Sequence, residues 1–86
     1  MSKQLITTIT GAGVNWRVED RGIVLGRGKS TDHKEARATV NRRFGGYAGE
    51  DVRLSTKLYD ELKNAYKETG ETPKGFLDGN YTLEDE

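Results

Sequence analysis

The clearest polarity pattern near the start of the chain is a strict alternation over residues 14–19, with Val14, Trp16 and Val18 on one face. Alternation with a period of two is typical of a strand that is buried on one side. Residues 4–10 are rich in β-branched side chains, and residues 23–25 are apolar, so both favour strands as well. A tight turn is expected at residues 20–22, and it would join the strand at residues 14–19 to the strand at residues 23–25. Residues 4–26 are therefore predicted to form a three-stranded antiparallel meander with Trp16 as a core anchor.

Two helices are predicted from capping residues and apolar spacing. Asp32 and Glu35 have the spacing of a capping box, and the helix that they open is expected to run to residue 44 before Gly45 ends it. Residues 26–29 are interpreted as a mobile link before this helix. Ser55 is predicted to cap the second helix, which follows a short strand at residues 51–54 and runs to residue 69.

The order of these elements predicts an α+β fold, β-β-β-α-β-α, in which a three-stranded antiparallel meander packs against two helices. The strand at 51–54 would add a short strand at an edge, and residues 76–83 could form a C-terminal hairpin around an Asp-Gly turn. We expect residues 1–83 to form one small domain and residues 84–86 to form an acidic, solvated tail.

Composition narrows the class of protein. The chain has 86 residues and no cysteine, so it has neither a disulfide framework nor a thiol nucleophile. It has no apolar run long enough to span a membrane, and its start lacks the basic and apolar regions of a signal peptide. We therefore expect a protein of the cytoplasm. Its size and lack of catalytic motifs are also typical of small proteins encoded by phages and mobile elements.

Three short motifs resemble chemical sites but have the wrong spacing. Residues 26–30 lack the first glycine of a phosphate-binding P-loop, and residues 11–16 lack the third glycine of a dinucleotide fingerprint. Residues 78–83 lack the central glycine of a calcium loop. The single histidine, His33, is expected on the helix surface without a second histidine to complete a metal pair. We therefore expect no enzyme activity, metal or cofactor.

The net charge is zero, but residues 1–47 carry a net charge of +5 and residues 48–86 one of −5. If Val14, Trp16 and Val18 face the helix, Arg17 points to the opposite face of the meander, and further basic residues leave the second turn and the third strand. The first helix adds further basic residues beside the apolar stripe formed by Ala36, Val40 and Phe44. Such a cluster attracts phosphates, and the residues expected to bind nucleic acid are Arg17, Arg21, Arg27, Lys29, Lys34, Arg37 and Arg42.

Residues 14–40 resemble the three-strand-plus-helix pattern of AP2 and integrase arm-binding DNA domains. The resemblance is carried by Trp16, Val18, Leu25-Gly26, Ser30-Thr31, Glu35-Ala36 and Ala38. It implies that the outer sheet face docks on DNA through Arg17, Arg21 and Arg27. Residues 51–70 also resemble the strand and first helix of ribbon-helix-helix repressors, whose outward strand residues read bases.

Two classes of function remain open on the sequence. The first is a small regulatory protein that binds nucleic acid through a basic sheet face and the first helix. The second is a protein-interaction module, such as a small inhibitor or adaptor without nucleic-acid binding, which the neutral net charge and the acidic second half favour. Either could act as a homodimer.

Overall fold

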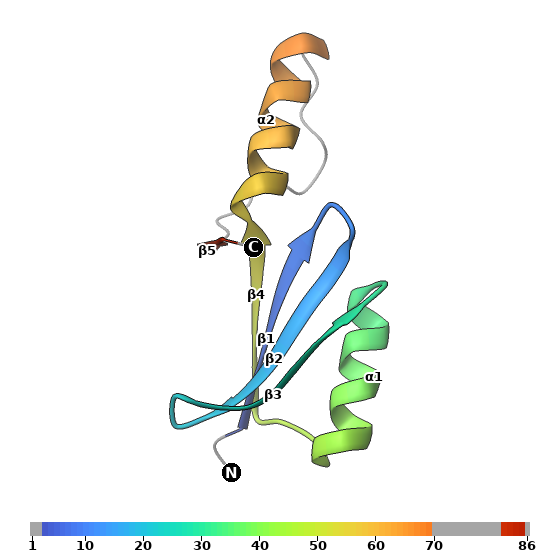
Figure 1. Ribbon diagram of the computed structural model, residues 1–86, viewed down its shortest axis with the longest axis vertical. Coiled ribbons are helices and arrows are strands. Elements are labelled where there is room, and N and C mark those ends of the chain that lie inside the picture. The colour runs from blue at the N-terminus through green and yellow to red at the C-terminus, as the bar shows by residue number, and fades with distance from the viewer. Residues whose placement is uncertain (1–2, 70–81, 86) are drawn as a thin grey trace.

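The computed structural model describes residues 3–69 and 82–85, which form a five-stranded mixed sheet and two helices (Figure 1). The elements in chain order are β1 (Lys3–Thr10), β2 (Gly13–Asp20), β3 (Ile23–Ser30), α1 (His33–Phe44), β4 (Gly49–Ser55), α2 (Thr56–Thr69) and β5 (Thr82–Glu84). The strand order is β3-β2-β1-β4-β5. Strands β1, β2 and β3 are antiparallel, whereas β4 runs parallel to β1 and β5 runs parallel to β4. The predicted α+β fold with an antiparallel meander and two helices is confirmed.

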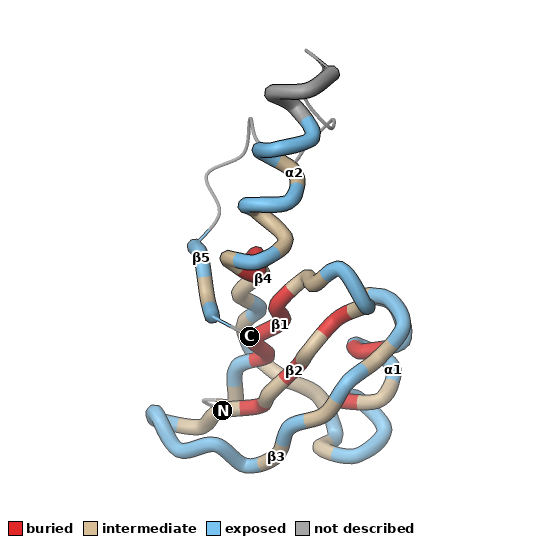
Figure 2. The backbone as a smooth tube through the Cα atoms, turned by 45° about the horizontal axis from the view of Figure 1, so that its top comes forward, coloured by how far each residue is buried: buried red, intermediate tan, exposed pale blue. Residues whose placement is uncertain are grey.

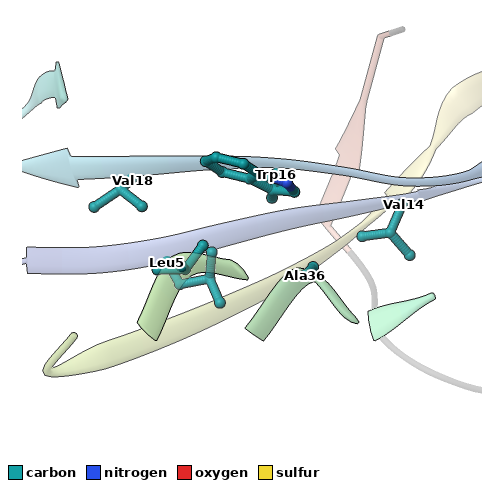
Figure 3. Close-up of a cluster of buried hydrophobic side chains, with 6 residues drawn as sticks. Leu5, Val14, Trp16, Val18 and Ala36 are labelled. Atoms are coloured by element: carbon teal, nitrogen blue, oxygen red, sulfur yellow. The ribbon is translucent and has the colours of Figure 1, made fainter. Parts of the chain in front are cut away.

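The main core lies between the sheet and α1. Figure 3 shows side chains of β1, β2 and α1 gathered into one buried cluster: Leu5, Val14, Trp16, Val18 and Ala36. Trp16 is only 4% exposed, which confirms it as a core anchor. Its ring meets the Phe44 ring edge-on, with 6.3 Å between the ring centroids. Alternation in β2 therefore fixes which face of the sheet is covered by α1.

The third strand is longer than the apolar run at residues 23–25 predicts. Residues 26–29, interpreted from the sequence as a mobile link, are part of β3. Their glycines have a packing role, because a Cβ atom on Gly28 would lie 2.5 Å from Cζ2 of Trp16, and one on Gly26 would lie 2.6 Å from Cζ of Phe44. At Gly26 and Gly28, the covered face of β3 thus carries no side chain, so that two aromatic rings fit against it.

Both helices begin where their capping residues predict, and α1 ends at the predicted Gly45. Oδ1 of Asp32 accepts a hydrogen bond from the Glu35 backbone N–H at 2.8 Å, and Gly45 ends α1 with a φ of 73°. Ser55 Oγ accepts from the Leu58 N–H at 3.3 Å at the start of α2. These contacts satisfy backbone groups that the helix itself leaves unpaired.

The two helices occupy different places relative to the sheet. Helix α1 lies against β2 and β3, whereas α2 continues directly from β4 and extends beyond the end of the sheet (Figure 1). The strand predicted at residues 51–54 is the longer β4, and it lies between β1 and β5 and not at an edge, because β5 pairs with its outer side. Most of the predicted C-terminal hairpin falls outside the described residues. No helix in the described part of the chain is both long and apolar enough to cross a membrane.

Candidate functional site

The face of the sheet opposite α1, called the open face below, carries the polar side chains of β2 and β3. Because Val14, Trp16 and Val18 face α1, the alternate residues of β2 face the other way. The strand register places Asn15 opposite Lys29 and Arg17 opposite Arg27. Three cations and one amide therefore lie together on two neighbouring strands, as the sequence predicts for Arg17, Arg27 and Lys29.

Arg17 is neutralised by carboxylates on this face. Its Nε donates to Glu19 Oε2 at 2.6 Å, and its Nη1 donates to Glu84 Oε1 at 2.6 Å. Glu84 also accepts from Thr8 Oγ1, and its Oε1 accepts from Arg53 Nη1 at 3.3 Å. Arg53 Nε in turn donates to Asp51 Oδ2 at 2.9 Å. The centre of the open face is thus a chain of alternating charges, called the ionic network below: Glu19, Arg17, Glu84, Arg53 and Asp51.

The pKa values of two members reflect this network. The hydrogen bond to Glu19 is the main cause that raises the pKa of Arg17, and Glu84 raises it further against the opposing effect of burial. Partial burial alone would raise the pKa of Glu84, but hydrogen bonds from Thr8 and Arg17 hold it below its ordinary value. Glu84 was expected in a solvated tail, yet it lies in β5 and its side chain is only 22% exposed. The reason is that β5 pairs with β4 and brings the carboxylate over the sheet.

Six of the seven residues predicted to bind nucleic acid are exposed, and five of these six have no ion pair or hydrogen bond to another described side chain. They lie at the hairpin tip between β2 and β3, on β3 itself and on α1, which packs beneath β3. We call this group the basic edge: Arg21, Arg27, Lys29, Lys34 and Arg42. The cations do not share one face, because α1 and the open face lie on opposite sides of the sheet. Arg27 and Lys29 lie on the open face of β3, and Lys34 and Arg42 belong to the helix that packs against its other face.

The remaining predicted residue, Arg37, belongs to a separate cluster on the α1 side. Its Nε donates to Glu50 Oε1 at 3.0 Å, and His33 Nε2 contacts the same oxygen. Burial alone would raise the pKa of Glu50, but the hydrogen bonds from His33 and Arg37 keep it below its ordinary value. This cluster attaches α1 to β4. The guanidinium of Arg37 is therefore already engaged in an ion pair within the fold.

Carboxylates are concentrated on the side of the molecule away from β3. The strand order separates β3 from β4 and β5 by two strands. In the described residues, β4, α2 and β5 carry Glu50, Asp51, Asp60, Glu61 and Glu84. The described carboxylates of the acidic half thus lie toward the edge of the sheet formed by β5, on the other side of the molecule from β3.

A hollow of about 300 Å³ lies on the open face between β3 and the C-terminal strand. Ile6, Thr8 and Asn15 contribute to its lining, together with Arg27 and Lys29 on the β3 side. Glu84 and Asp85 line it as well. Sequence reasoning missed the acidic side, since the ion pair between Arg17 and Glu84 joins residues 67 positions apart.

Comparison with known proteins finds no matching family model, no matching curated protein and no matching solved structure. Within residues 3–69 and 82–85, no group of three or more metal-ligating side chains comes together. The geometry above offers cations and hydrogen-bonding groups on the open face and along β3.

Proposed function

We propose that this protein binds nucleic acid through the basic edge. The observation that supports the proposal most is the distribution of unpaired charge. Residues 21–44 contain seven basic and two acidic residues, and all five cations of the basic edge are exposed without an acidic partner among the described residues. Phosphates bind such a surface and release counterions as they do so.

The role of Arg17 differs from the one that the sequence alone favours. Its guanidinium already has two carboxylate partners, so a phosphate would have to compete with Glu19 and Glu84. Arg27, directly opposite, has no such partner among the described residues. We therefore assign phosphate binding to β3 and the flanking residues of α1 instead of the centre of the sheet.

Arg21 adds a conformational argument. Arg21 and Gly22 have φ values of 54° and 82°, as a two-residue type I′ hairpin turn requires. Asn, Asp or Gly is favoured at such positions, and other residues are strained there. A cation at this tip stands where backbone preference would select a smaller residue, and strained positions are enriched at functional sites.

The test is fluorescence anisotropy of labelled DNA and RNA oligonucleotides at about 50 and 200 mM salt, the range over which phosphate-driven affinity changes most. The triple variant Arg27→Gln, Lys34→Gln and Arg42→Gln should lose at least tenfold in affinity. The matched control Lys57→Gln with Lys63→Gln removes exposed cations from α2 and should change affinity less than threefold. Equal losses in both variants, or no binding at 50 mM salt, would contradict the proposal.

A protein-binding role is the second candidate, favoured by the apolar start of edge strand β3. Ile23, Val24 and Leu25 are 67%, 39% and 45% exposed (Figure 2 shows the start of β3 as exposed). An edge strand can pair with an extended segment of a partner. Under this alternative, Leu25→Thr would weaken partner capture and oligonucleotides would not bind at low salt.

A further inference from the structure

The cations without carboxylate partners in the described part of the chain lie on one side of the hollow, called the β3 bank, whereas Arg17, which also lines the hollow, is paired with Glu19 and Glu84. Arg27 and Lys29 lie on the β3 bank, and both are exposed without a partner among the described residues. Glu84 and Asp85 lie on the opposite bank. One row of phosphates can therefore approach along β3, whereas a second row, as in a duplex, would meet carboxylates.

The floor of the hollow suits a flat, partly apolar group. Ile6 is 5% exposed and Thr8 is equally buried, and Asn15 adds an amide beside them. The volume of about 300 Å³ is at the lower end of the range for small-ligand pockets. A base can enter such a space only when it is unpaired and turned out of its stack.

The side of the hollow opposite β3, which carries the two carboxylates, keeps one hydrogen-bond acceptor unused by the described residues. Both oxygens of Glu84 are used by Thr8, Arg17 and Arg53. Asp85 Oδ1 accepts from Thr56 Oγ1 at 2.8 Å, which leaves Oδ2 without a partner in the part of the chain that the structure describes. A carboxylate at this position accepts hydrogen bonds from an exocyclic amino group, which cytosine has and thymine lacks.

We infer that the ligand is single-stranded nucleic acid and that one of its nucleotides binds in this hollow. Its phosphate lies against Arg27 and Lys29, and its base lies over Ile6 with an amino group toward Asp85. The inference rests on the proposed function and adds strand class and base preference to it.

The test compares anisotropy of a labelled 12-nucleotide oligo(dC), an oligo(dT) of equal length and a 12-base-pair duplex at about 50 mM salt. We expect oligo(dC) to bind at least tenfold more tightly than the duplex and at least threefold more tightly than oligo(dT). Asp85→Ala should abolish the preference for oligo(dC) over oligo(dT), a ratio that a general loss of structure would not change selectively.

The double variant Arg27→Gln with Lys29→Gln should weaken oligo(dC) binding at least tenfold. Lys34→Gln with Arg42→Gln removes the same charge from the α1 part of the basic edge, away from the hollow, and should weaken oligo(dC) binding by a smaller factor. Equal or tighter duplex binding, or equal losses in the two double variants, would overturn the hollow as a nucleotide site while leaving the basic edge as a general phosphate-binding surface. Failure of all three oligonucleotides to bind would overturn the proposed function itself.

Discussion

Arg17 on β2 donates a hydrogen bond from Nη1 to Oε1 of Glu84 on β5 across 2.6 Å, although the two residues lie 67 positions apart in the chain. The contact joins the second strand to the last one over the open face of the sheet. Its side chains are 26% and 22% exposed, so it is shielded from solvent more than most surface ion pairs. It therefore couples the position of β5 to the meander.

Replacing Glu84 should weaken this coupling. We expect Glu84→Gln to lower the free energy of unfolding at pH 7 by about 1 kcal/mol, since Arg17 and Arg53 lose a shared acceptor. Urea denaturation followed by circular dichroism measures the change. Glu61→Gln makes the same chemical change at an exposed carboxylate of α2 and should have little effect. Equal stability of the two variants would contradict the structural role of Glu84.

The effect of Glu84 should also depend on pH. Its pKa is lower in the folded protein than the ordinary value, so its contribution to stability is complete above the unfolded carboxyl pKa of about 4.3 and disappears as pH falls through the folded value. The difference in unfolding free energy between the wild type and Glu84→Gln should thus be constant near neutral pH and shrink below about pH 4. A difference that grows on acidification would contradict the direction of this pKa shift.

Gly28 should tolerate no side chain. We expect Gly28→Ala to lower the free energy of unfolding by about 1–3 kcal/mol, because the added Cβ would overlap the Trp16 ring. Tryptophan fluorescence should shift at the same time as the ring moves. Gly11→Ala is the matched control, since a Cβ there finds only an ordinary contact at 3.6 Å. Full stability of Gly28→Ala would show that the ring is not packed against β3.

Replacing Arg21 should increase the stability of the fold and decrease the affinity for nucleic acid. Arg21→Asn should raise the free energy of unfolding by about 0.5–1 kcal/mol, because Asn adopts the left-handed conformation of this turn at lower cost. The same variant should weaken oligonucleotide binding, since it removes one cation of the basic edge. Thermal melts and anisotropy give the two readings. Arg27→Asn, on a strand, should weaken binding without any gain in stability.

The cap of α1 gives an independent check of the local structure. We expect Asp32→Ala to lower the free energy of unfolding by about 1 kcal/mol, because the Glu35 N–H loses its acceptor. Asp32→Asn keeps an acceptor oxygen at the same place and should retain most of the stability. Equal losses in both variants would contradict the capping role.

The features that the sequence predicts are the local ones. Alternation in β2 identifies the buried side of Trp16, and the caps Asp32 and Ser55 mark where the helices begin, because each signal depends on neighbours in the chain. The glycines of β3 lead to a wrong prediction of a mobile link. They are required because the rings of Phe44 and Trp16, which are distant in the sequence, pack against them.

The site is predicted less completely than the fold for the same physical reason. Arg17 lies on the open face as strand alternation predicts, whereas Arg27 and Lys29 lie there because residues 26–29 extend β3 instead of forming a mobile link. The neutralisation of Arg17 depends on Glu84, which reaches it only through the pairing of β5 with β4. No periodicity in the sequence encodes that long-range register, so an arginine expected to bind phosphate proves to be part of the ionic network.

The most direct test of the basic edge is a ¹H–¹⁵N correlation spectrum of the labelled protein recorded during titration with a 12-nucleotide oligo(dC) at about 50 mM salt. The account predicts that shift changes concentrate at residues 21–30, at the facing positions of β2 and on α1, and that they reverse as salt is raised toward 200 mM. Changes concentrated on β4 and α2, or an unchanged spectrum at saturating oligonucleotide, would contradict it.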